Sequence, residues 1–315
     1  MHREKKTGMK WNDPQLAESI SALSRGAFGA RGQKIAEYDE SFVRKAIVKR
    51  MAVHGIQKVA TYGGYLACQR EEVDELSRSL RIGYSEFFRN PLTFALLEQW
   101  ILPSLAAEKK SLGCGEIRVW SAGSAAGQEA WSIAMLLDAM SEPAEPRISH
   151  RIFATDLSEP DLALAEAGEY SAEAVGNVRL RHLNDCFSRQ GERFVIAPRL
   201  RERVSFSVYD LLDESLSSPE ASLYGDFDLI FCCNLLFYYR SDIRRRILSK
   251  VCAALSPGGY IVTGEAERDI VAAHEGLHIV APPIAVFQKG CNSRSARFSM
   301  NHNAPGIFND DGKTL

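Results

Sequence analysis

The sequence lacks the features that mark several large classes of protein. Its seven cysteines are an odd number, and no two of them have Cys-x-x-Cys spacing, which argues against a disulfide framework and a cysteine-bound metal. No apolar run approaches the roughly 18 residues that a membrane span needs. The charged first residues are not followed by the apolar stretch of a secretory signal. We therefore predict a cytoplasmic protein with no metal site and no membrane insertion.

The charge balance excludes a second group of functions. Lys and Arg number 38 against 40 Asp and Glu, a net charge of -2, so no excess of positive charge indicates nucleic acid binding. Hydrophobic residues make up 45% and charged residues 25%, as in ordinary globular proteins. The 315 residues allow one large and one smaller domain. We expect a monomer without a nucleic acid partner.

The stretch that is most informative runs from residue 117 to residue 129. An apolar strand (117–122) leads into a small-residue turn and then into a helix over 130–140. Small side chains let a ligand approach the backbone, and the N–H groups at a helix start favour polar or anionic groups. The pattern is typical of a nucleotide-binding βα unit. Because the two glycines of the turn are four residues apart, an ordinary strand-to-helix turn stays open as an alternative.

Polar residues follow other predicted strands. A strand over 151–156 ends in Asp156, which can accept both hydrogen bonds of a ribose diol. The alternative role, capping the helix over 159–167, is less favoured because Ser158 can serve as that cap. Asn234 stands at the end of an apolar strand that begins at residue 226, and Asp210 stands after a strand over 204–208. Asp210 can meet an adenine amino group or cap the next turn.

A basic helix is predicted over residues 39–54. Val43, Ile47 and Met51 repeat every four residues and indicate a buried face. The helix also carries four positive charges within seven residues. They form either a solvated face or a docking surface for an acidic partner: Arg44, Lys45, Lys49 and Arg50.

The order of the elements predicts the domains. A helical domain with its linker is expected over residues 1–90, with helices at 13–24, 59–67 and 71–80. An α/β domain is expected over 91–290 and opens with a helix over 92–106. Strands at 193–196 and 204–208 predict a small antiparallel insert, about residues 186–208. A polar tail over 291–315 is expected to be disordered.

Several motifs, in this order, resemble the CheR-type chemotaxis receptor methyltransferases, which esterify glutamate side chains with S-adenosylmethionine. The resemblance covers about residues 35–290. It is carried by the helical region with its basic helix, by Ser85-Glu86-Phe87-Phe88-Arg89, by Trp120-Ser121-Ala122 through Gly127-Gln128-Glu129, by Ala154-Thr155-Asp156, by Phe231-Cys232-Cys233-Asn234 and by Pro257-Gly258-Gly259.

The resemblance implies a class I, Rossmann-like methyltransferase sheet of the α/β class, with an N-terminal helical domain and a small antiparallel β insert. It also implies roles for individual residues. Arg89 and Tyr238 would be catalytic, and the basic helix would meet the cytoplasmic helices of a methyl-accepting chemotaxis receptor. The implied contacts to S-adenosylmethionine, and to its product S-adenosylhomocysteine, come from Gly83, Ser85, Arg89, Ala122, Gly123, Glu129, Asp156, Asp210, Leu211, Asn234 and Leu235.

The chain departs from the family pattern at Gly83, Gln128 and Cys233, where the family usually has Asn, an acid and Arg. These departures keep two alternatives open. One is a methyltransferase of the same fold with another acceptor. The other is a catalytically weak relative that binds a receptor or the cofactor as a regulatory module. An NAD-dependent oxidoreductase is less favoured, because little chain remains after Gly259 for a second nucleotide-binding half.

Overall fold

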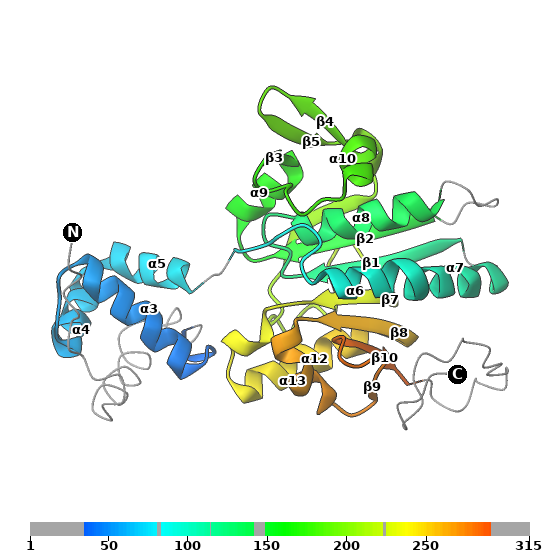
Figure 1. Ribbon diagram of the computed structural model, residues 1–315. Coiled ribbons are helices and arrows are strands. Elements are labelled where there is room, and N and C mark those ends of the chain that lie inside the picture. Colours follow the sequence, from blue (N-terminus) through cyan, green and yellow to red (C-terminus); the bar gives the residue numbers. More distant parts are fainter. Residues whose placement is uncertain (1–34, 81–82, 114, 142–148, 223–224, 291–315) are drawn as a thin grey trace, which may run out of the picture.

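The computed structural model describes residues 35–80, 83–113, 115–141, 149–222 and 225–290 (Figure 1). The expected helix over 13–24 and the tail over 291–315 lie outside the described residues. Figure 1 shows two parts: the helices α3 to α5 stand to one side, and the remainder surrounds a large sheet. None of the described helices combines the length and the apolar composition needed to cross a membrane.

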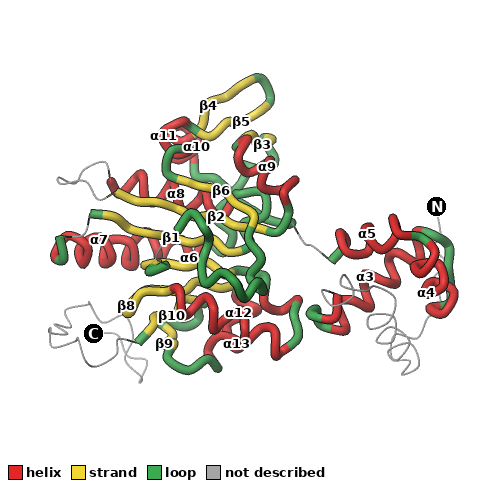
Figure 2. The backbone as a smooth tube through the Cα atoms, turned by 180° about the vertical axis from the view of Figure 1, so that it is seen from behind, coloured by secondary structure: helices red, strands yellow, loops and turns green. Residues whose placement is uncertain are grey.

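A seven-stranded sheet organises the larger part, in the order β6-β2-β1-β7-β8-β10-β9 (Figures 1 and 2). The first five strands in this order are mutually parallel, while β10 runs antiparallel to both β8 and β9. The predicted class I methyltransferase fold is confirmed. The strands are β1 (Glu116–Ala122), β2 (Ser149–Asp156), β6 (Val204–Val208), β7 (Phe227–Cys232), β8 (Leu255–Thr263), β9 (Leu277–Ile279) and β10 (Val286–Lys289).

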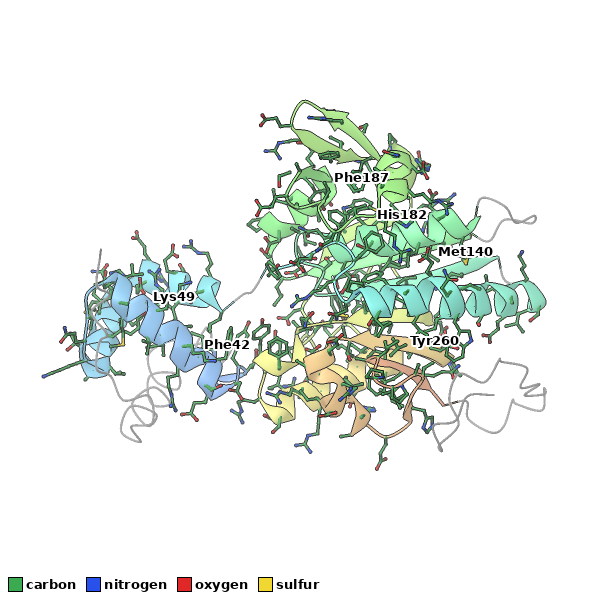
Figure 3. The ribbon with its side chains drawn as sticks, viewed as in Figure 1. Phe42, Lys49, Met140, His182, Phe187 and Tyr260 are labelled. Carbon is green, nitrogen blue, oxygen red and sulfur yellow. The ribbon has the colours of Figure 1, made fainter. Side chains whose placement is uncertain are left out.

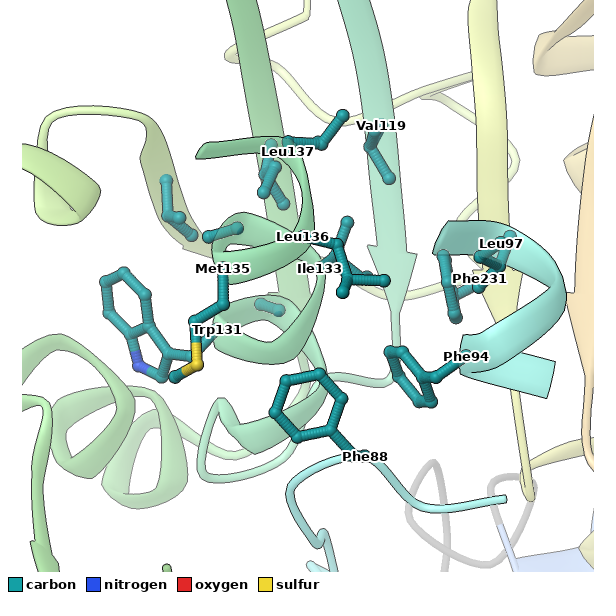
Figure 4. Close-up of a cluster of buried hydrophobic side chains, with 14 of the residues drawn as sticks. Phe88, Phe94, Leu97, Val119, Trp131, Ile133, Met135, Leu136, Leu137 and Phe231 are labelled. Atoms are coloured by element: carbon teal, nitrogen blue, oxygen red, sulfur yellow. The ribbon is translucent and has the colours of Figure 1, made fainter. Parts of the chain in front are cut away.

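Helices cover both faces of this sheet, because successive side chains of each central strand point to opposite sides. Val119 of β1 faces one apolar cluster and Trp120 faces the other. Figure 4 shows the first cluster, in which Phe94 packs against Phe231 on one side of the helix α8 while Trp131 lies on its other side. The helices are α6 (Pro91–Leu96), the π-helix η1 (Leu97–Ile101), α7 (Leu102–Ser111), α8 (Gln128–Ser141), α9 (Glu159–Ala167), α12 (Ser241–Ala254) and α13 (Arg268–Ala272), with 3-10 turns η2 (Leu236–Tyr238) and η3 (Glu265–Glu267).

The small antiparallel insert differs from its predicted composition. It consists of β3 (Glu169–Ser171), β5 (Arg193–Ile196) and β4 (Phe187–Gln190), in that order, with α10 (Leu180–Cys186) and α11 (Pro198–Arg201) beside them. The prediction that Val204–Val208 belongs to it is wrong, since β6 pairs in parallel with β2 as the edge strand of the main sheet. Alternating polarity identified a strand there but carried no information about its partner.

The helical part is built from α3 (Glu40–Val53), α4 (Val59–Cys68) and α5 (Arg70–Ser79). The predicted buried face of α3 is confirmed, because Val43, Ile47 and Met51 are each at most 3% exposed in a common cluster with α4 and α5. Asp39 caps α3 by accepting a hydrogen bond from the backbone N–H of Ser41 at 3.0 Å. This part therefore has an apolar core of its own.

Candidate functional site

A cavity of about 290 Å³ opens at the carboxyl ends of the parallel strands, beside the point where the strand order reverses between β1 and β7. Ligands of open α/β sheets bind at such a position. A smaller cavity of about 30 Å³ shares Arg89, Gly123 and Asn234 with it and is also lined by Ser85 and Glu129. The larger cavity brings together these residues expected from the sequence: Gly83, Arg89, Gly123, Asp156, Leu211, Asn234, Leu235 and Tyr238.

The turn after β1 contributes shape to the cavity rather than free hydrogen-bond donors. The backbone N–H groups of Gly123 and Ser124 both donate to the carbonyl oxygen of Thr155, at 2.8 and 2.9 Å. Gly127 has φ +86°, and a Cβ there would lie 2.7 Å from the Cβ of Ala165, so a glycine is required for α8 and α9 to approach. These two N–H groups are used within the protein, whereas the N–H groups expected to favour a ligand are those at the start of α8.

Asp156 lies at the end of β2 and lines the cavity. Its two oxygens each accept one backbone hydrogen bond at 2.9 Å, one from Ala125 and the other from Ser158. Burial raises the pKa of its carboxyl group above the ordinary value. Ser158, as predicted, caps α9. Each carboxylate oxygen of Asp156 keeps a second lone pair for a ligand hydroxyl.

Arg89 lies in a strained segment that leads from the helical part to α6. Phe88 and Asn90, on either side of it, have φ values of +51° and +60°. Left-handed backbone at a bulky Phe costs about 1–3 kcal/mol and persists only where the surroundings hold it. The N–H of Phe88 donates to the Oγ of Ser132 at 2.9 Å, and the Arg89 guanidinium lies 5.4 Å from the ring centre of Tyr84. This geometry brings Arg89 into the lining of both cavities.

Glu129 is one of two acidic residues that line the smaller cavity, the other being Glu86. The hydroxyl of Ser121 donates to its Oε1 at 2.7 Å. Burial raises the pKa of Glu129 to about 7, although hydrogen bonds from Ser121 and Cys233 oppose that rise. A buried carboxyl group with such a pKa is suited to receive a cationic group of a ligand.

Glu267 was not singled out from the sequence, yet it holds the loop that follows β7. Its side chain is fully buried, and its Oε1 accepts from the backbone N–H groups of Leu235 and Leu236 at 2.7 and 2.6 Å. Its Oε2 accepts from Asn234 at 2.7 Å and from Gly264 at 2.9 Å. Asn234 has φ +57°, a left-handed conformation that Asn tolerates better than most residues, and the carboxylate fixes the turn in that conformation. No sequence pattern signals the contact, because it spans more than 30 residues.

Tyr238 lies where the helical part meets the cavity. Its backbone oxygen accepts a hydrogen bond from the N–H of Asp39 at 2.7 Å, and its ring lies 4.7 Å from that of Phe42, the α3 residue labelled in Figure 3. Next to it, Tyr38 and Tyr239 form an antiparallel bridge and stack at 4.9 Å. Tyr38 was also missed by the sequence reasoning, as were other cavity residues: Tyr84, Ala125, Leu157, Asp161, Tyr209 and Tyr239.

Two of the expected cofactor residues lie elsewhere. Ala122 is fully buried in the second apolar cluster and does not line either cavity. Asp210 lines a neighbouring cavity of about 510 Å³ and accepts a hydrogen bond from the N–H of Leu212 at 2.9 Å. The turn-capping alternative for Asp210 therefore fits its geometry better than a contact in the main cavity.

The four basic residues of α3 have different surroundings. Lys45 and the labelled Lys49 are exposed (Figure 3). Arg44 is 21% exposed and lies 3.8 Å from Glu40. Arg50 instead turns toward α5, where its Nε donates to the buried Glu72 at 2.8 Å. Only the two lysines are thus plainly available to an outside partner.

Comparison with known proteins agrees with this architecture. Residues 84–279 match the family described as CheR methyltransferase, SAM binding domain. Chemotaxis protein methyltransferase 1 of Pseudomonas aeruginosa is 32% identical over 230 residues, 71% of this chain and 81% of that protein. A chemotaxis protein methyltransferase of Listeria monocytogenes is 28% identical over 84% of this chain and 95% of its own length. An uncharacterized 104.1 kDa protein of Rhodobacter capsulatus is 31% identical over 80% of this chain, which spans only 25% of that protein. The chain therefore belongs to the CheR methyltransferase family, with S-adenosylmethionine as its cofactor.

Proposed function

We propose that the protein transfers the methyl group of S-adenosylmethionine to glutamate carboxylates of methyl-accepting chemotaxis receptors. The observation that carries this proposal is the joint lining of the two adjoining cavities by Arg89, Asp156, Glu129 and Tyr238. The chemotaxis methyltransferases to which the chain is similar support the choice of receptors as substrate.

The lining residues fit the cofactor chemically. Asp156 would accept from the ribose hydroxyls with its remaining lone pairs. Glu129, in the adjoining smaller cavity, would pair with the ammonium group of the methionine part. Leu211 and Leu235 supply apolar surface to the larger cavity for the adenine. When bound, S-adenosylmethionine supplies an electrophilic methyl group on a positively charged sulfur.

No general base is needed for this reaction, because a glutamate carboxylate with a pKa of about 4.3 is already ionised at neutral pH. Arg89 would orient the incoming carboxylate through charge-assisted hydrogen bonds. Burial raises the pKa of Tyr238, so its phenol stays protonated and can donate one hydrogen bond. The enzyme would gain rate mainly by orienting the reactants and excluding water.

The exposed Lys45 and Lys49 on α3 would face an acidic surface of the receptor's cytoplasmic helices. This proposal places the enzyme in the cytoplasm, acting as a monomer. Arg50 is not included in the docking surface, since its guanidinium is held by Glu72.

The test mixes the protein, S-adenosylmethionine labelled in its methyl group, and membranes that contain chemotaxis receptors. We expect protein-bound label that mild alkali releases as methanol, since carboxyl esters are alkali-labile. Label that is stable to alkali would instead indicate another acceptor group. Cofactor binding without any transfer would indicate a regulatory relative. The matched control is Glu159→Ala, an exposed acid outside both cavities, which should retain full activity.

A further inference from the structure

In the wall of the larger cavity, the side chain of Asp161 lies against the backbone of Gly83. A Cβ built on Gly83 would lie 2.5 Å from Oδ2 and 3.0 Å from Cγ of Asp161. The carboxylate of Asp161 therefore fills the volume that a side chain at position 83 would take. Both residues line the cavity, although 78 positions of sequence separate them.

The carboxylate of Asp161 is not used to cap its own helix. Asp161 is the third residue of α9, and its backbone N–H donates to the Oγ of the N-cap residue Ser158. In a capping box, the acid at this position accepts in return from the backbone N–H of the N-cap. Here that N–H donates to Asp156 instead, at 2.9 Å. Within the described part of the chain, no hydrogen bond or ion pair to the Asp161 carboxylate occupies it.

The position of Asp161 relative to Asp156 indicates which ligand group it meets. Both acids belong to the segment that ends β2 and begins α9, and both line the same cavity. Burial is the main cause of the raised pKa of Asp156, and backbone hydrogen bonds oppose it. The negative charge of Asp161 raises that pKa further, so the two carboxylates are close enough to interact electrostatically. Two acceptor groups that converge on one cavity favour a ligand with several hydroxyl donors.

We infer that Asp161 is a cofactor-binding residue of this chain, which accepts a hydrogen bond from the ribose of S-adenosylmethionine beside Asp156, in the space left by Gly83. The inference rests on the cofactor site proposed above. It adds a second acid to the nucleoside part of that site. It also explains why position 83 is a glycine, since a side chain there would collide with the Asp161 carboxylate.

The first experiment measures binding of S-adenosylhomocysteine and of 5′-methylthioadenosine, which lacks the amino-acid part, by titration calorimetry. We expect Asp161→Ala to weaken both ligands by about tenfold or more, the usual effect of losing a hydrogen bond to a charged group. Glu159→Ala, in the same helical turn but exposed, should leave both affinities unchanged. Loss of affinity for S-adenosylhomocysteine alone would overturn the ribose assignment, and no loss for either ligand would overturn the inference.

The second experiment tests the shared space. Gly83→Asn should weaken S-adenosylhomocysteine binding because the new side chain collides with Asp161. In the double variant Gly83→Asn/Asp161→Ala, the loss of affinity should be smaller than the product of the losses in the two single variants. Thermal midpoints check that each variant is folded. Strictly additive effects would contradict the shared space. If the unaltered protein does not bind S-adenosylhomocysteine, the cofactor site itself is wrong, an outcome distinct from failure of the Asp161 variants.

Discussion

Replacing Glu267 with Gln tests whether one buried carboxylate holds the loop that carries Asn234 and Leu235. Each carboxylate oxygen accepts two backbone N–H groups, so an amide in its place leaves two N–H donors facing an NH₂ group. An unpaired buried donor costs about 1–3 kcal/mol, so two cost about 2–6 kcal/mol. The carboxylate is fully buried, and water cannot readily replace it.

We expect the free energy of unfolding of Glu267→Gln to fall by about 2–6 kcal/mol in urea titrations. The affinity for S-adenosylhomocysteine should fall at least about tenfold, because the displaced turn moves Asn234 and Leu235 in the cavity wall. The matched control is Glu265→Gln, an exposed acid two residues away, which should behave as the unaltered protein. A Glu267→Gln protein with unchanged stability and unchanged affinity would refute the anchoring role.

Three further predictions concern other charged groups. Arg89→Ala should lower turnover, measured by initial rates, more than it weakens receptor docking, measured by receptor pull-down. Equal losses in both would count against a role of Arg89 in orienting the carboxylate. Burial raises the pKa of Glu129 to about 7, so below pH 7 its carboxyl group is mostly protonated. It must then lose this proton before it can pair with an ammonium group. The affinity for S-adenosylhomocysteine should therefore rise with pH up to about 7 in calorimetry, and Glu129→Gln should abolish that dependence. Burial would raise the pKa of Glu72, but hydrogen bonds from Arg50, Tyr62 and His54 outweigh it and lower that pKa from 4.5 to about 2. Ionised Glu72 thus contributes about 3 kcal/mol above pH 4.5, which is lost as the pH falls toward 2. The difference in urea stability between the unaltered protein and Glu72→Gln should shrink over that range, and a constant difference would contradict this account.

The sequence predicted local elements well where one pattern dominated. The helix over 159–167 and its Ser158 cap are confirmed, as is the buried stripe of α3. The apolar runs that became β1, β2 and β7 were strong signals because strands covered on both faces are apolar throughout. The predicted helix over 92–106 is interrupted by the π-helix Leu97–Ile101, which has no sequence signature.

Contacts between distant segments could not be predicted in the same way. Asp156 was singled out because it ends a recognisable strand, whereas Glu129 was singled out only through the resemblance to the CheR family. Glu267 and Asp161 were missed because their importance comes from the register of other strands and helices. Arg50 was grouped with the exposed lysines, since its sequence position alone does not reveal the buried acid on α5 that it pairs with.

The bridge between Tyr38 and Tyr239 has a consequence for engineering chimeras of this family. It joins the residues before α3 to the loop after Tyr238 through hydrogen bonds from Asp39 to Tyr238 and from Arg240 to Glu37. A chimera that exchanges only the first 90 residues to redirect the enzyme to a foreign receptor would replace one side of this bridge. Transplanting both sides together would keep the Tyr38–Tyr239 ring stack matched, because that side-chain contact depends on residue identity and the backbone hydrogen bonds do not.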